Sequence, residues 1–251
     1  MHKRSAAPSL FTILLICLVI VLALYRYLHR SNLHRSNSQG FNSQIRCGEH
    51  CGTERWQIKT VSDPESRKID WSPRSSSISD LSKLEAPRVL DDSRAEAETH
   101  VYSVQAILMG WKEETGAHGD RDYHLVLADP DDLQRTLIAE APSSDCTSAC
   151  RSSHVQQFLE ARRELVSRLA PPQAHFRRLN PAWLVKVQGV GFFDIYHNQI
   201  GVAENCIELH PVLHIELLRE LGPETILPHK IEAPSEHGCG RLEKSYSSPE
   251  E

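Results

Sequence analysis

The sequence predicts a mainly β fold with one helix (α+β). We expect an OB-like five-stranded antiparallel barrel, with its helix between the third and fourth strands, preceded by one transmembrane helix. Apolar and polar residues alternate in five segments, and between the third and fourth the hydrophobic period changes to that of a helix. This element order is that of an OB-fold. An apolar run near the N-terminus predicts the membrane helix.

The N-terminal part of the chain predicts a membrane anchor and a tether. Residues 1–5 form a short basic tail. Residues 6–25 are apolar over about 20 residues, the length of a transmembrane helix or signal anchor. A signal peptide cleaved after Ala23 is the alternative. Residues 26–52 are rich in Ser, Asn and Arg and predict a flexible tether.

Cysteine usage indicates the side of the membrane, because basic residues flank the apolar segment on both sides and leave its orientation undecided. Outside that segment the cysteines are Cys47, Cys51, Cys146, Cys150, Cys206 and Cys239. Their even number is typical of disulfides in an oxidising compartment, with the pairing left open, and two Cys-x3-Cys pairs leave a zinc site as the alternative. We therefore expect a single-pass membrane protein whose C-terminal domain lies outside the cytoplasm.

Three further segments complete the domain plan. Residues 53–98 predict an N-terminal extension that packs on the barrel, in which residues 56–59 alternate as in a strand and residues 79–84 have the leucine spacing of a short helix. Residues 99–217 make up the OB-like domain. Residues 218–251 are rich in proline and poor in apolar residues, and predict a disordered tail.

Each element of the barrel has its own pattern. Alternation predicts strands over 101–112, 123–128 and 135–141 and on either side of the polar loop 194–205. Short turns between the first three indicate an antiparallel meander. Ser153 begins a capping-box pattern, and an apolar stripe at helical spacing follows it as far as Leu169.

The last strand pair and its loop carry the candidate catalytic residues, His197, Glu208 and His210. Glu208 and His210 share one face of the final strand, and neighbours on such a face lie about 7 Å apart, close enough to share a ligand. Histidine and carboxylate side chains hold divalent metals, or act as base and acid in phosphodiester hydrolysis. A metal-assisted, nuclease-like phosphodiesterase would use these residues with Glu140 and Asp194.

A second set of residues predicts a binding module on the same barrel. Loops on a rigid scaffold usually carry binding residues, and outward side chains of the strands would add contacts. The candidate ligand contacts are Trp111, Lys186, Gln188, Asp194, Gln199 and Asn205. A nucleic acid strand, a saccharide or an envelope protein would fit. We expect no metal or other cofactor here, and a divalent metal only in the hydrolase alternative.

Composition and the absence of motifs favour binding over catalysis. The formal net charge of −5 argues against a chain coated in nucleic acid, because phosphate binding normally shows as a basic excess. The usual motifs of serine hydrolases, zinc proteases and nucleotide-binding loops are absent. Each candidate residue also has an ordinary structural role on a strand surface or in a turn. We therefore expect a membrane-anchored binding domain with an unknown ligand more than an enzyme.

Four blocks of the sequence resemble a family of uncharacterised exported or membrane-anchored bacterial proteins. The blocks are Trp56-Gln-Ile-Lys-Thr60, Asp122-Tyr-His-Leu-Val-Leu127, Ile138-Ala-Glu-Ala-Pro142 and the motif GVGFFD...H.Q.GVA.N.IELHPVL over residues 189–213. The last block is the most specific. The loop 114–121 is longer than the family's, and Cys150 is additional. The resemblance implies the domain boundaries and a bacterial origin, and it implies no activity.

Overall fold

The computed structural model describes residues 47–48, 51–52, 54–115, 119–222, 239 and 241–242. The predicted anchor at residues 6–25 lies outside the described residues, as do most of the predicted tether and most of the predicted tail. In the described part of the chain, no helix is long and apolar enough to cross a membrane.

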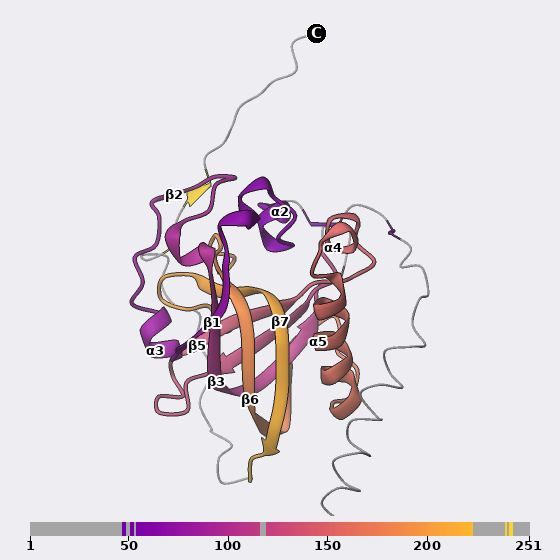
Figure 1. The fold of residues 1–251 in the computed structure, drawn as a ribbon. Helices are drawn as coiled ribbons and strands as arrows, with labels where there is room; N and C mark the ends of the chain where they lie inside the picture. Colours follow the sequence, from indigo (N-terminus) through magenta and orange to yellow (C-terminus); the bar gives the residue numbers. More distant parts are fainter. Residues whose placement is uncertain are drawn as a thin grey trace, which may run out of the picture. The chain divides into compact units, whose positions relative to one another are not determined.

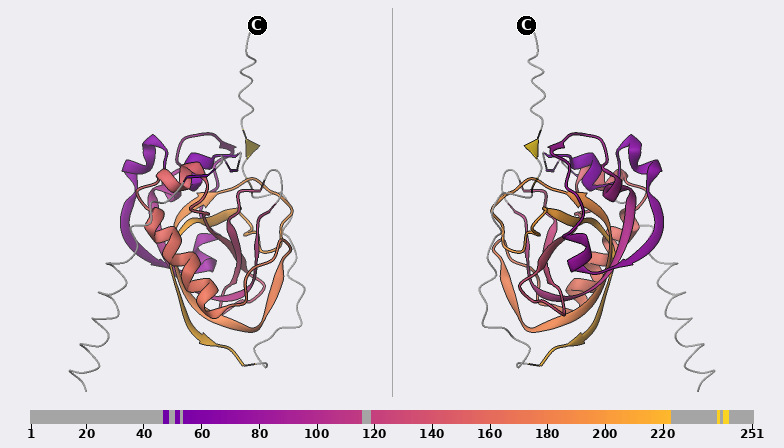
Figure 2. Two further views of the ribbon diagram at one scale, coloured as in Figure 1. Left: turned by 90° about the vertical axis from the view of Figure 1, so that its right-hand side faces the viewer. Right: turned by 90° about the vertical axis from the view of Figure 1, so that its left-hand side faces the viewer.

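The described part of the chain is mainly β, with a six-stranded mixed sheet and few helices. The strands of this sheet are β1 (Asp70–Ser76), β3 (His100–Glu113), β4 (Tyr123–Ala128), β5 (Thr136–Ala141), β6 (Arg177–Phe193) and β7 (Ile207–Glu220). They are hydrogen-bonded in the order β1-β3-β4-β5-β7-β6. Because β6 also pairs with β3, the strands β3, β4, β5, β7 and β6 close into a ring (Figure 2). A separate two-stranded sheet pairs β2 (Val89–Leu90) with β8 (Arg241–Leu242).

All the predicted strands of the ring are present, but the sheet is not wholly antiparallel as predicted. β5 runs parallel to β7, with Ile138 opposite Glu208 and Ala139 opposite Leu209. β1 also runs parallel to β3. A parallel pair needs a long crossover connection. The chain between β5 and β7, which includes two helices and β6, supplies it.

Bulges and glycines bend β3 and β6 enough to close the ring. β3 is irregular between Leu108 and Gly110, where its pairing with both β4 and β6 shifts register. A Cβ on Gly110 would lie 2.6 Å from the carbonyl oxygen of Arg177, and one on Gly191 would lie 2.5 Å from that of Ala97. Only glycine permits such close backbone approaches, so these positions fix where the strands bend.

Apolar side chains from the ring strands form the core. Its fully buried members include Val104, Leu108, Leu125, Leu127, Leu137, Val185, Val187 and Leu209. Trp111 belongs to the same cluster and is 1% exposed. The predicted outward position of Trp111 is therefore wrong. The irregularity next to Gly110 shifts the alternation of β3 by one residue, which turns Trp111 from the outer face to the core face.

The helices are short apart from the last one. They are α2 (Trp56–Lys59), α3 (Ile78–Leu81), α4 (Thr147–Arg151) and α5 (Val155–Arg168), with 3₁₀ turns at Pro64–Lys68 and Glu96–Thr99. α5 buries Phe158, Ala161 and Leu165 and lies beside β7 (Figure 1). The predicted helix is confirmed between β5 and β6. Its N-cap, however, is His154 and not the predicted Ser153.

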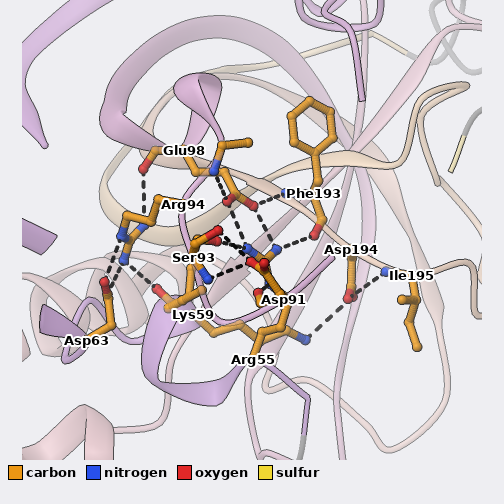
Figure 3. A network of polar contacts seen from close by, with 12 residues as sticks. Arg55, Lys59, Asp63, Asp91, Ser93, Arg94, Glu98, Phe193, Asp194 and Ile195 are labelled. Carbon is orange, nitrogen blue, oxygen red and sulfur yellow. Dashed lines mark hydrogen bonds and ion pairs between the residues drawn. The ribbon is translucent and has the colours of Figure 1, made fainter. Parts of the chain in front are cut away.

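A buried charge network fixes the N-terminal extension to the ring (Figure 3). The Arg55 guanidinium donates to both carboxylate oxygens of Glu98 and to the carbonyl oxygen of Phe193, each at 2.8 Å. Arg94 pairs with Asp63, and both side chains are buried. Because Arg55 directly precedes α2 and Phe193 ends β6, the network holds α2 beside that end of β6.

Loss of the Arg55 charge is expected to remove much of the stability of the fold. Arg55→Met leaves the Glu98 carboxylate buried without its cation, and such an uncompensated charge costs about 3–5 kcal/mol. Urea unfolding followed by circular dichroism would show a lower midpoint with an unchanged slope. Arg88→Met, at an exposed position, is the matched control and should stay within about 0.5 kcal/mol of wild type. Equal midpoints for Arg55→Met and wild type would contradict the expectation.

Three disulfides join the cysteines in the pairs Cys47–Cys150, Cys51–Cys146 and Cys206–Cys239. Of the two alternatives left open by the sequence, disulfides or zinc, the structure has the disulfides. The two Cys-x3-Cys pairs are bonded to each other, not within themselves. They clamp the end of the predicted tether, just before the extension, to α4 and to the residue that precedes α4.

Opening this clamp is expected to destabilise the fold. A disulfide of such long span contributes about 2–5 kcal/mol, because its loss frees the unfolded chain and loosens the extension. Urea unfolding of Cys51→Ser/Cys146→Ser should show a loss in this range, and so should the wild-type chain in a reducing agent. If reduction left the unfolding midpoint unchanged, the bonds would not be contributing to stability.

Candidate functional site

A polar cavity of about 250 Å³ lies between α2 and two loops of the ring. One loop, residues 114–122, joins β3 to β4 and is described except for 116–118, and the other, residues 194–206, joins β6 to β7. The lining consists of Gly52, Glu54, Trp56, Lys59, Glu114, Asp120, Glu140, Asp194, His197 and Gln199. Carboxylates dominate, and Lys59 is the one lysine or arginine among these described residues. We refer to this site as the acidic cavity.

Glu54, Asp194 and His197 converge on one point of the acidic cavity. His197 Nε2 lies 3.2 Å from Glu54 Oε2 and 3.8 Å from Asp194 Oδ2. One donor atom from each residue lies within 4.8 Å of the other two. The backbone N–H of Ile195 donates to Asp194 Oδ1 at 2.9 Å and fixes that carboxylate (Figure 3). Two carboxylates and an imidazole form a donor set that divalent cations bind.

Lys59 reaches the same group from α2. Its Nζ lies 3.5 Å from Asp194 Oδ2 (Figure 3) and 5.5 Å from the centre of the Phe192 ring. Burial lowers the pKa of Lys59, but the carboxylates of Asp194 and Glu140 raise it by more, so that the pKa lies well above the usual lysine value. Lys59 is therefore a permanent positive charge inside the acidic cavity.

From the acidic cavity inward, acidic and basic side chains alternate in the order Glu114, His124, Glu140, His210 and Asp122. His124 Nδ1 lies 3.4 Å from Glu114 Oε1 and 2.8 Å from Glu140 Oε1. His210 lies 3.0 Å from Glu140 Oε2 through Nδ1 and 3.1 Å from Asp122 Oδ2 through Nε2. Sheet pairing brings together His124, Glu140 and His210 at the centre of this row. His124 of β4 is opposite Glu140 of β5, and β5 lies next to β7, which carries His210.

These pairings fix the charges of Glu140 and His210. Burial raises the pKa of Glu140, but pairing with His124 and His210 outweighs it and holds the pKa well below the usual value. Burial lowers the pKa of His210, but Asp122 and Glu140 raise it to about 9. At neutral pH Glu140 is therefore anionic and His210 cationic. Glu140 lines the acidic cavity, and His210 holds it from behind.

Two other carboxyl groups have raised pKa values. Burial and the neighbouring carboxylates of Asp122 and Glu140 raise the pKa of Asp120 to about 8. Burial and the Asp194 carboxylate raise the pKa of Glu208 well above its usual value. Glu208 Oε2 is also buried, and no described residue forms a hydrogen bond with it. The site thus has more carboxyl groups than its described cations neutralise, a charge balance that favours a bound cation.

The predicted catalytic residues are placed at different depths. Asp194, His197 and Glu140 line the acidic cavity. Glu208 is 4% exposed and His210 is fully buried. Because His210 lies behind Glu140, the predicted contact of His210 with a substrate does not fit the structure. The alternation of β7 had indicated an outward face at 208 and 210, but that part of the strand is covered on both sides.

The predicted ligand contacts do not gather at one place. Gln199 lines the acidic cavity with Asp194, whereas Lys186 and Gln188 lie along β6 outside its lining. Asn205 is buried and donates to the carbonyl oxygens of Leu81 at 3.0 Å and Leu84 at 2.9 Å. Asn205 therefore ties the end of α3 to the β6–β7 loop, a structural role.

Three ionisable lining residues, Glu54, Glu114 and Asp120, were not predicted as members of a common site. No motif marks them, since one comes from the extension and two from the β3–β4 loop. The available signal was the polar, glycine-containing sequence of that loop.

No family model, curated protein or solved structure matches the chain. The resemblance to exported or membrane-anchored bacterial proteins therefore stays an expectation from the sequence blocks. The function has to be inferred from the chemistry of the acidic cavity.

Proposed function

We propose that this protein is a hydrolase of phosphate diesters that uses a divalent cation bound in the acidic cavity. The observation that carries the proposal is the convergence of Glu54, Asp194 and His197 beside the charged Lys59. Oxygen and imidazole donors of this kind hold a cation and leave coordination positions open for water and substrate.

The strand order supports an OB-like barrel as the scaffold. The ring runs β3-β4-β5-β7-β6 and back to β3, with α5 between β5 and β6. In OB-folds the loops after the first and fourth strands contribute to ligand binding. The equivalent loops of this chain, residues 114–122 and 194–206, both line the acidic cavity. Fold analogy alone carries little weight, so the proposal depends on the side chains.

Each residue of the acidic cavity has a part in the proposed reaction. A bound divalent cation would polarise the phosphoryl group and lower the pKa of a water molecule. Glu114, whose pKa is lowered despite its burial by pairing with His124, accepts a proton as the water oxygen bonds to phosphorus. Asp120 retains a proton until its pKa of about 8 and donates it to the leaving ester oxygen as the P–O bond breaks. Lys59 stabilises the negative charge that develops on the phosphoryl oxygens.

The charge of the cavity makes cation dependence a strict requirement of this proposal. Several carboxylates face the space that a phosphate would enter, and like charges repel strongly where water is scarce. A divalent cation held by Glu54, Asp194 and His197 would offset this repulsion. Without it, neither binding nor hydrolysis of a phosphate ester is expected at this site.

The test is hydrolysis of single-stranded and double-stranded DNA and RNA by the full chain in magnesium, manganese, calcium or zinc. We expect cleavage that a chelator stops and that His197→Ala lowers at least about 100-fold. His175→Ala, an exposed histidine outside the cavity, is the matched control and should cleave like wild type. Cation-independent cleavage, or full activity in His197→Ala, would refute the proposal.

The second candidate is the binding module, favoured by the same two loops. Cation-dependent binding of a nucleic acid, a saccharide or an envelope protein without product formation would support it over the hydrolase. We also propose that the domain lies outside the cytoplasm of a bacterial cell, anchored through residues 6–25. Three disulfides support this location, because such bonds persist in oxidising compartments.

A further inference from the structure

A second hollow, of about 260 Å³, has the opposite charge to the acidic cavity. Its lining includes Arg168, Arg177, Arg178, Trp183 and Glu220. Arg168 ends α5, Arg177 begins β6 and Glu220 ends β7. In Figure 1, α5 and β7 both run away from α2. We refer to this site as the arginine hollow.

Positive charge is concentrated in the arginine hollow although the chain as a whole carries −5. Three exposed arginines and one acidic residue, Glu220, line it. Arg177 and Arg178 are consecutive at the start of β6, where they pair with Trp111 and Gly110 of β3. The Arg168 guanidinium lies 5.9 Å from the centre of the Trp183 ring, so that an aromatic contact positions it.

This arrangement fits a phosphate group better than other anions. A guanidinium presents a planar fork of donors that binds two phosphate oxygens at once, and several forks around one hollow serve more than one phosphate. A strand of nucleic acid carries phosphates at regular spacing, each of which projects and can enter a hollow. Lipid headgroups instead form a plane, which meets a hollow poorly.

We propose that the arginine hollow binds the phosphate backbone of a single-stranded nucleic acid. The inference does not depend on hydrolysis, because binding here needs no divalent cation. If the acidic cavity is a phosphodiesterase site, the arginine hollow is a docking site for its polymeric substrate, separate from the residues that react.

The experiment measures fluorescence anisotropy of a labelled single-stranded oligonucleotide with the full chain in a chelator, over a series of salt concentrations. We expect binding that weakens as salt rises, and Arg177→Ala/Arg178→Ala should lower affinity at least about 10-fold. The double variant should also reduce the slope of log affinity against log salt by about 1 for each phosphate that it no longer neutralises. Inorganic pyrophosphate should compete with the oligonucleotide.

The matched control is Arg67→Ala/Arg88→Ala, which removes the same charge from exposed positions outside the hollow. Equal reductions of affinity in the two double variants would overturn the proposal in favour of non-specific attraction. Arg168→Ala gives a second test that leaves β6 intact. If this variant and Arg177→Ala/Arg178→Ala both bound the oligonucleotide with wild-type affinity, the proposal would also be overturned. The proposal would also be overturned if vesicles of anionic phospholipid competed more strongly than unlabelled oligonucleotide. Because these measurements contain a chelator, failure of the proposed hydrolysis would not change them.

Discussion

Asp194→Asn is expected to remove most of the affinity of the acidic cavity for a divalent cation, with a loss of about 100-fold or more. Asp194 provides a carboxylate to the converging group with Glu54 and His197, and loss of even an indirect support of a metal ligand costs about 10–100-fold. The substitution also removes the anion that Lys59 contacts at 3.5 Å. Lys59 would then repel a cation with less compensation from neighbouring carboxylates. Titration calorimetry with manganese measures the loss directly.

The control for Asp194→Asn is Asp131→Asn, the same chemical change at an exposed position between β4 and β5. It should bind manganese like wild type. Hydrolysis should fall in parallel with cation affinity in Asp194→Asn if one site serves both. Unchanged affinity in Asp194→Asn would place the cation elsewhere and remove the basis of the proposed function.

The strands and the long helix were predictable because each repeats a simple pattern over many residues. β3, β4 and β5 alternate strongly enough to be located within one or two residues, and α5 follows the helical stripe that ends near Leu169. The alternation fails at one local defect. The irregularity beside Gly110 reverses the faces of β3 beyond it, which moves Trp111 into the core. A single extra residue in a strand has no signature in the sequence pattern.

The acidic cavity was less predictable because its parts are distant in sequence. Segment 56–59 alternates like a strand but forms α2, whose i and i+3 positions bring Trp56 and Lys59 to the same side. Four residues are too few for periodicity to separate the two structures. The buried ion pair between Arg55 and Glu98 places that helix, and pairings between such distant residues are not visible in one sequence.

The predicted solvent-facing position of His210 is wrong for a related reason. The pattern of β7 identified polar residues on one face, which is correct, but the prediction required this face to meet solvent. In the folded chain it meets Asp122 and Glu140, which come from other parts of the ring. A polar strand face indicates a partner, but it does not say whether that partner is water, a ligand or another buried charge.

The retained protons lead to the second large effect, an unusual dependence of stability on pH. A group whose pKa is higher in the folded than in the unfolded chain stabilises the fold below its unfolded pKa, and this contribution is lost as pH rises through the folded pKa. Asp120, with a folded pKa of about 8, loses its contribution between about pH 4 and pH 8. His210, with a folded pKa of about 9, loses its own between about pH 6.5 and pH 9. The raised pKa values of Glu208 and His124 act in the same direction.

In a chelator, the free energy of unfolding is therefore expected to fall from about pH 5 to pH 9. The fall is about 1.4 kcal/mol per pH unit for each proton that the folded chain holds and the unfolded chain does not. Glu140, whose pKa is lowered, reaches its full contribution at acidic pH and does not oppose this fall. A divalent cation bound in the acidic cavity replaces protons, so saturating manganese should flatten the slope and raise stability most at high pH. Urea unfolding across this range in chelator and in manganese measures both effects, and Asp120→Asn should reduce the slope in chelator. A flat profile in chelator would mean that these carboxyl groups are neutralised by charges other than protons, and the cation site would lose its electrostatic support.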